Sequence, residues 1–135
     1  MGISVSGDAA YVVGALEYAR SVGCLTIAVT SNDDAKMIAH SEVAIVTDTG
    51  AEVVTGSTRM KAGSAHKMVL NMISTTVMIK LGKVYENMMI NLKPSNIKLR
   101  DRMIRITCDI LSCDIETAEK RLEKSGWNIR KAVEL

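Results

Sequence analysis

The chain has 135 residues, of which 47% are apolar, 24% charged and 3% aromatic, and its formal net charge is +2. This composition is typical of one globular domain, or of a small domain with an appendage, and it argues against disorder. The basic residues are scattered along the chain, so the charge pattern predicts neither a nucleic acid nor a membrane surface as a partner.

The first half of the chain predicts a parallel sheet, because short β-branched runs alternate with helical segments. We expect strands at residues 3–5, 25–29 and 43–46, a crossover helix over 9–22 that ends at Gly23, and a short second helix over 33–40. Three strands leave both edges of such a sheet apolar and uncovered. Missing sequence or tight oligomerisation would cover them, and we expect a homo-oligomer.

The second half predicts helices only. A segment rich in Thr, Gly and Ser leads into a long helical pattern, which Gly82 ends. Its apolar stripe includes Ala65, Met68, Val69, Met72 and Ile79. A linker over 83–93 precedes Pro94, which suits the first turn of a new helix. Two short helices follow, with N-caps at Asp114 and Asn128, and they complete a three-helix unit. We therefore predict an α/β domain over 1–93 and a helical unit over 94–135.

The first candidate binding segment is Ser6-Gly7-Asp8, directly after the first predicted strand and before the crossover helix. In open parallel sheets, ligands bind outside the carboxyl ends of strands, where loop amides favour anions. Ser6 would add a hydroxyl, and Gly7 would allow close approach of the backbone. The alternative is a Ser-Gly turn in which Asp8 caps a helix, and the spacing alone favours this alternative.

The second candidate segment contains Ser57, Thr58, Arg59 and Lys61 at the start of the long helical pattern. Hydroxyls and cations at a helix start suit a phosphate or carboxylate, although the order of residues is not that of a Walker A loop. In the structural alternative, Ser57 or Thr58 is an N-cap and the cations are solvated. The residues by themselves leave these two interpretations open.

The run GAEVVTGSTRMKAGSAHK from Gly50 to Lys67, with LNMIST at 70–75 and LGKVY at 81–85, resembles the N-acetylmuramic acid 6-phosphate etherases. These are a branch of the sugar-isomerase (SIS) domain proteins, and the whole chain resembles about the second half of such an enzyme. The resemblance implies a partial SIS-type parallel sheet flanked by helices, a dimer, and a C-terminal bundle similar to ubiquitin-associated domains. The implied roles are those of peptidoglycan recycling and amino sugar metabolism.

The resemblance also implies a carbon-oxygen lyase reaction that splits the lactyl ether into N-acetylglucosamine 6-phosphate and D-lactate. A base removes the proton next to the ring-opened carbonyl, lactate leaves, and water adds back. The glutamates that the family uses lie in its first half, so we expect no catalytic residue in this chain. The implied sugar phosphate ligands here are Ser6, Gly7, Ser57, Thr58 and Lys61.

This chain departs from the family pattern at Asp8, where relatives usually have arginine. The alternatives to an etherase part are therefore a non-catalytic sugar phosphate sensor and a helical interaction module. Three cysteines without a CxxC pair argue against a disulfide framework and a zinc site, and no metal or other cofactor is expected. Without a signal peptide or a membrane-length apolar run, the chain is expected in the cytoplasm.

Overall fold

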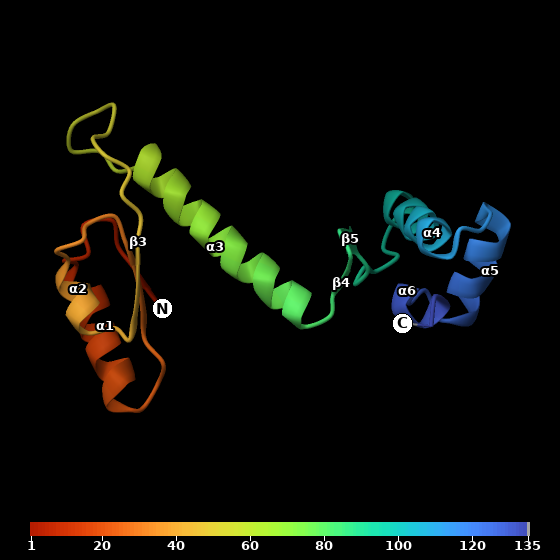
Figure 1. The fold of residues 1–135 in the computed structure, drawn as a ribbon, viewed down its shortest axis with the longest axis horizontal. Coiled ribbons are helices and arrows are strands. Elements are labelled where there is room, and N and C mark those ends of the chain that lie inside the picture. Colours follow the sequence, from red (N-terminus) through yellow and green to blue (C-terminus); the bar gives the residue numbers. More distant parts are fainter. Residues whose placement is uncertain (135) are drawn as a thin grey trace. The chain divides into compact units, whose positions relative to one another are not determined.

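The computed structural model describes residues 1–134, and they form two compact units, Met1–Ile73 and Ser74–Leu135 (Figure 1). The first unit contains a parallel sheet with helices, and the second is mainly helical. The expected α/β class with C-terminal helices is therefore confirmed. The expected domain boundary after residue 93 stays a prediction, because compact packing units and domains divide a chain by different criteria.

The sheet has three parallel strands in the order β1-β2-β3. These are β1 (Gly2–Ile3), β2 (Ile27–Thr30) and β3 (Val43–Val46). The pairing continues beyond β1, since the backbone N–H of Ser4 donates to the carbonyl of Val29. All three strands are close to their expected positions, because β-branched runs of four to eight residues carry a strong local signal.

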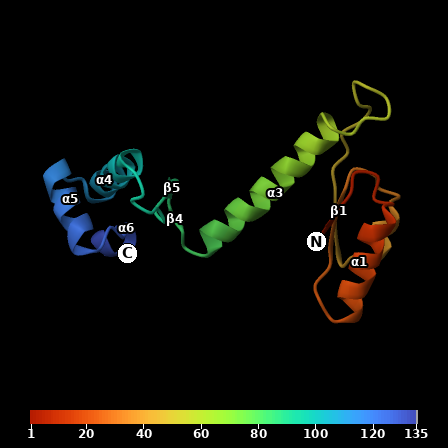
Figure 2. The same cartoon turned by 180° about the vertical axis from the view of Figure 1, so that it is seen from behind.

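One face of this sheet is covered by α1 (Ala10–Ser21) and α2 (Lys36–Ala39), as Figures 1 and 2 show from opposite sides. The buried cluster between these helices and β2 consists of Leu16, Ala28, Ala35 and Met37. Apolar side chains elsewhere on the sheet remain exposed, namely Ile3 (42%), Val43 (43%) and Val46 (41%). These exposed side chains agree with the expectation that a three-stranded sheet is incompletely covered.

The long helix α3 runs over Lys61–Lys80, and Gly82 follows it with φ +66°, as expected of a glycine after a helix end. Its buried residues, Ala62, His66 and Val69, share one face of its first turns. Of the stripe expected from the sequence, Val69 is buried, whereas Met68, Met72 and Ile79 are 61%, 59% and 53% exposed. Helical periodicity identified the helix, whereas the neighbouring chain determined which face is buried.

The segment expected to be a linker instead contains a two-stranded hairpin, β4 (Val84–Tyr85) and β5 (Met88–Met89). Its two-residue turn has Glu86 at φ +51°. This turn lacks the Asn-Gly or Asp-Gly sequence that identifies most such hairpins, so the sequence did not predict it. Side chains of the hairpin pack on the core of the following helices.

Three helices complete the second unit: α4 (Ile97–Leu111), α5 (Ile115–Lys124) and α6 (Ile129–Ala132). Pro94 does not begin α4. The side chain of Asn96 accepts the Leu99 N–H at 2.8 Å and is the actual N-cap. The shared core consists of Ile90, Met103, Ile106, Leu122, Ile129, Ala132 and Val133.

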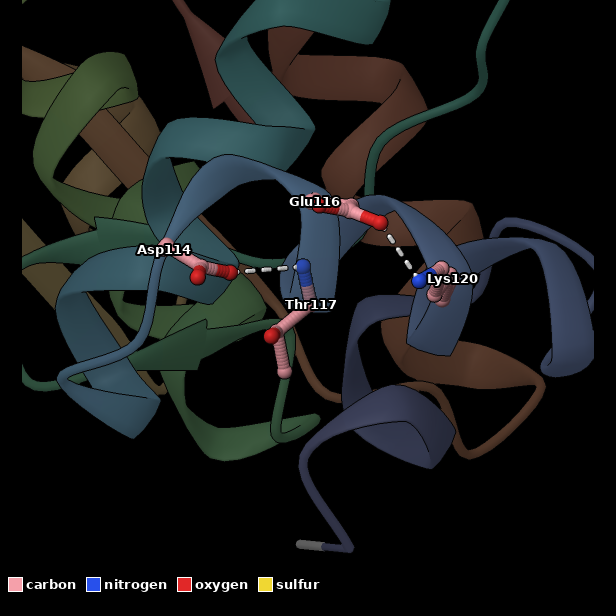
Figure 3. A network of polar contacts seen from close by, with 4 residues as sticks. All are labelled: Asp114, Glu116, Thr117 and Lys120. Atoms are coloured by element: carbon pink, nitrogen blue, oxygen red, sulfur yellow. Dashed lines mark hydrogen bonds and ion pairs between the residues drawn. The ribbon is translucent and has the colours of Figure 1, made fainter.

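The predicted N-caps of the last two helices are confirmed. Asp114 accepts the Thr117 N–H at 2.8 Å, and this bond is drawn in Figure 3 beside the exposed pair Glu116–Lys120. Asn128 accepts the Lys131 N–H at 3.1 Å. Within residues 1–134, no helix combines the length and apolar character needed to cross a membrane.

Candidate functional site

The candidate site is the edge of the sheet where β1, β2 and β3 end. Because the strands are parallel, their carboxyl ends meet at one edge. The loop after β1 and the segment 47–60 after β3 lie at this same end of the sheet in both views (Figures 1 and 2). Both sequence-predicted binding segments therefore belong to this edge.

Gly7 has a structural role in the loop after β1. Its φ is +72°, and a Cβ at this position would lie 2.2 Å from the Cβ of Ala35, so only glycine fits. Its N–H donates to the Ser4 hydroxyl at 3.1 Å, and its carbonyl accepts the Met37 N–H at 3.1 Å. The Gly7 amide is thus occupied by the protein, and Gly7 shapes the loop.

Asp8 occupies a donor that an anion would otherwise use. Its carboxylate accepts the backbone N–H of Lys36, the first residue of α2, at 3.1 Å. The helix that directly follows Asp8 has no side-chain cap. Asp8 therefore caps a helix, as the structural alternative proposed. The helix that it caps is α2 and not α1, the helix that directly follows Asp8.

Ser6 faces solvent beside this contact. Its carbonyl accepts Nδ2 of Asn32 at 3.1 Å, which ties the loop after β1 to the loop after β2. Its hydroxyl forms no hydrogen bond with any residue that the structure describes. That hydroxyl is free to donate to a ligand.

The N-terminus of α3 is occupied by Glu52. Both carboxylate oxygens lie 3.1 Å from the Lys61 nitrogen, and one also accepts the Ala62 N–H at 3.1 Å. These backbone hydrogen bonds, led by the one from Lys61, hold the pKa of Glu52 below its ordinary value. This geometry gives Glu52 a structural role, since its charge is already satisfied at the helix end.

The hydroxyls of Ser57 and Thr58 remain available for a ligand. Neither residue caps α3, because that helix begins at Lys61. One backbone group of each is already used: the Ser57 N–H donates to the Val54 carbonyl, and the Thr58 carbonyl accepts from the Gly63 N–H. In the described part of the chain, neither hydroxyl has a partner.

Two cations accompany these hydroxyls. The Lys61 ammonium donates to the Ala51 carbonyl at 2.8 Å, which leaves two of its three protons for other acceptors. Arg59 is exposed and forms no ion pair within residues 1–134. Among the described residues, no hydrogen bond or ion pair joins Ser57, Thr58 or Lys61 to Ser6 or Gly7.

The sequence analysis missed a hydrogen-bonded row that lies between the two segments. The Ser31 hydroxyl is 2.9 Å from the Thr47 hydroxyl and 3.1 Å from Nε2 of His66. Ser31 follows β2, Thr47 follows β3, and His66 is on α3, with only 6% of its surface exposed. The one available signal was a polar residue directly after each of two predicted strands, of which β2 is buried and β3 largely exposed.

Counting the hydroxyl protons shows which group donates each hydrogen bond of this row. Thr47 donates its single hydroxyl proton to the Thr30 carbonyl at 3.3 Å. Ser31 must then donate to Thr47, and its oxygen accepts a proton from Nε2 of His66. This assigns the Nε2–H tautomer to His66, which acts as a donor and not as a base toward Ser31.

The edge can therefore bind an anion with hydroxyls and lysine, and two of its carboxylates already accept backbone amides. Glu52 is committed to α3, and Asp8 to α2. No group of three His, Cys, Asp or Glu residues suited to a metal occurs among the described residues. The geometry fits a substrate-binding surface whose reactive groups come from elsewhere.

Comparison with known proteins adds a close similarity. The chain is 49% identical over 133 residues to the N-acetylmuramic acid 6-phosphate etherase of Symbiobacterium thermophilum, 47% to that of Pectobacterium atrosepticum and 48% to that of Oceanobacillus iheyensis. Each match covers 98% of this chain but only 44–45% of the relative, in its C-terminal half. No protein-family profile matches the chain.

Proposed function

Since this chain is homologous over nearly its whole length to the C-terminal half of N-acetylmuramic acid 6-phosphate etherases, we propose that it acts as that part of such an enzyme. The complete enzyme would cleave the lactyl ether of N-acetylmuramic acid 6-phosphate to N-acetylglucosamine 6-phosphate and D-lactate. In this proposal the chain binds the sugar phosphate, and the part that is absent from it supplies the base and the acid. The observation that carries the proposal is the identity of 44–49% over 133 residues.

The free hydroxyls at the sheet edge support the binding role. Ser6, Ser57 and Thr58 present hydroxyl donors without protein partners among the described residues, and Lys61 adds a positive charge. Phosphate oxygens accept hydrogen bonds from such groups, and a charged donor strengthens the interaction. Gly7 contributes indirectly, because it allows the tight loop that presents Ser6.

The carboxylates indicate why we assign substrate binding to this chain and the acid and base to the other half. Proton abstraction beside a carbonyl and protonation of the leaving oxygen each need a positioned acid or base, commonly worth about 10²- to 10⁴-fold in rate. Glu52 is the one glutamate in the segment after β3, and its oxygens already accept the two amides at the start of α3. In this proposal the reactive acid and base therefore come from the half of the relatives that this chain does not match.

Reconstitution tests this proposal directly. The purified chain is mixed with the first half of the Symbiobacterium thermophilum relative, and D-lactate release from N-acetylmuramic acid 6-phosphate is measured. The two halves of the relative mixed with each other form the positive control. We expect no turnover by the chain alone and measurable turnover by the hybrid pair. An inactive hybrid, beside an active control pair, would contradict the proposal.

Side-chain variants then test the assigned ligands within the hybrid. Removing both free hydroxyls, with Ser57→Ala and Thr58→Ala together, should raise KM about tenfold or more, because a hydrogen bond to a charged group is worth about 1.5–3 kcal/mol. Ser95→Ala, an exposed hydroxyl outside the edge, is the matched control. Equal KM values for the double variant and the control would remove these residues from the site.

A non-catalytic sugar phosphate sensor is the second candidate, and the contact of Asp8 favours it. Asp8 takes the Lys36 amide and places a negative charge beside the free Ser6 hydroxyl. Asp8→Asn should strengthen binding of a sugar phosphate, since the change removes that charge and keeps an acceptor for the amide. Full activity of the unmodified hybrid would rule out the sensor.

The proposal also includes a homo-oligomer, expected from the uncovered sheet edges and from the resemblance, and a cytoplasmic location, expected from the sequence pattern. Exposed apolar side chains on the sheet and on α3 support the association. The same side chains suit an interface with the missing half. Sedimentation of the reconstituted pair would distinguish a simple pair from a dimer of pairs.

A further inference from the structure

A polar groove lies within the second compact unit, away from the residues assigned above. Its walls come from the chain after α3, the chain after the hairpin, and the turn into α6. The enclosed volume is about 310 Å³, within the range of small-molecule sites. The residues that matter here are Lys83, Lys93, Trp127 and Arg130.

The groove carries positive charge only. Lys83, Lys93 and Arg130 line it, and its lining includes no aspartate or glutamate. Outside the lining, the guanidinium of Arg100 lies 4.8 Å from the centre of the Trp127 ring and adds positive charge near the groove. A concave surface lined by one sign of charge concentrates ions of the opposite sign.

Two of these cations are held in place before any ligand arrives. Nη2 of Arg130 donates to the Gly82 carbonyl at 2.5 Å, which leaves the other guanidinium protons for a ligand. Nζ of Lys83 lies 3.4 Å from Oδ1 of Asn91, across the end of the hairpin. Fixed donors lower the ordering cost of binding.

We propose that this groove binds a phosphate group of a small molecule, with Arg130 as the bidentate donor and Lys83 and Lys93 as charge partners. Arginine suits this role because its planar fork matches two phosphate oxygens. The volume admits a phosphorylated monosaccharide but not a polymer. This second site shares no residue with the sheet edge and does not depend on the proposed etherase role.

The single tryptophan of the chain lies in this groove, so its fluorescence reports binding there. The full chain is titrated separately with inorganic phosphate, with glucose 6-phosphate and with glucose, at an ionic strength held constant with sodium chloride. We expect a saturable change of Trp127 fluorescence with both phosphate compounds. A response to glucose 6-phosphate but to neither inorganic phosphate nor glucose would show that the site needs both the phosphate and the sugar, whereas an equal response to glucose would overturn the proposal.

Matched variants test the residues. Arg130→Gln should weaken the apparent affinity about tenfold, because it removes a charged donor pair. Arg102→Gln, an exposed arginine outside the groove, is its control. If the loss of the Gly82 contact unfolds the Arg130 variant, Lys93→Gln replaces it, with Lys98→Gln as control, because the Lys93 side chain is exposed.

Three further results would overturn the inference. The first is no fluorescence change with either phosphate compound. The second is a change that sodium chloride reproduces at the same ionic strength. The third is equal weakening in a groove variant and its control.

Discussion

Substitution of Gly7 by alanine tests whether the loop after β1 is built as the structure indicates. Gly7 is buried and has φ +72°, and an added Cβ would lie 2.2 Å from the Cβ of Ala35 and 2.9 Å from the Oγ1 of Thr30. Neither neighbour has a flexible end that can move aside. The substitution therefore combines backbone strain with overpacking.

The size of the effect follows from these two causes. A left-handed backbone costs an L-residue about 1–2 kcal/mol, and overpacking costs about 1–3 kcal/mol. We expect Gly7→Ala to lower the free energy of unfolding of the first unit by about 2–5 kcal/mol. At about 1.4 kcal/mol per tenfold, the opening equilibrium constant rises about thirtyfold or more.

Two other glycines separate the causes. Gly23 has φ +78° but open space around its added Cβ, so Gly23→Ala should show the backbone cost alone. Gly14, inside α1, has ordinary φ and open space, and Gly14→Ala should stabilise the helix by about 0.5–1 kcal/mol. The three variants carry the same chemical change in three environments.

Amide hydrogen exchange of β2 is the appropriate assay, because the two compact units can unfold separately and a whole-chain melting curve would mix them. We expect protection of the β2 amides from exchange to be highest in Gly14→Ala, lower in the unmodified chain, lower again in Gly23→Ala and lowest in Gly7→Ala. Equal protection in the Gly7 and Gly23 variants would refute the claimed contact with Ala35. Unchanged protection in the Gly7 variant would refute the loop geometry as a whole.

Three further predictions concern charge and association. Hydrogen bonds from the Lys61 and Ala62 amides lower the pKa of Glu52. Its carboxylate therefore stabilises α3 above pH 4.5, the ordinary pKa of a glutamate, and this stabilisation is lost as the pH falls through the lower pKa of the folded state. Glu52→Gln should flatten this acid dependence in amide exchange of α3. The Asp114 pKa is lowered mainly by hydrogen bonds from Thr117, so Asp114→Ala should speed exchange in the first turn of α5 at neutral pH, whereas Asp114→Asn should largely preserve protection. Sedimentation of the chain should show a dimer or larger assembly, because the sheet and α3 expose apolar side chains; a compact monomer at micromolar concentration would contradict this.

Local signals in the sequence were sufficient for most of the fold. The β-branched runs located the three strands, glycines marked the ends of α1 and α3, and Asp114 and Asn128 were correctly identified as N-caps. Each of these features depends on residues within a few positions of each other. The resemblance to the etherases likewise came from a contiguous run of residues, and it is confirmed by the comparisons.

Features that depend on distant residues were decided only by the tertiary structure. Glu52 reaches the N-terminus of α3 from nine residues away, and Asp8 caps a helix 28 residues away. The buried face of α3 and the row from His66 through Ser31 to Thr47 also require separate segments to meet. The amino-acid sequence specifies which hydroxyls, carboxylates and amides are present and how far apart they lie along the chain. Which carboxylate satisfies which amide, and hence which donors remain free for a ligand, depends on how the strands and helices pack together.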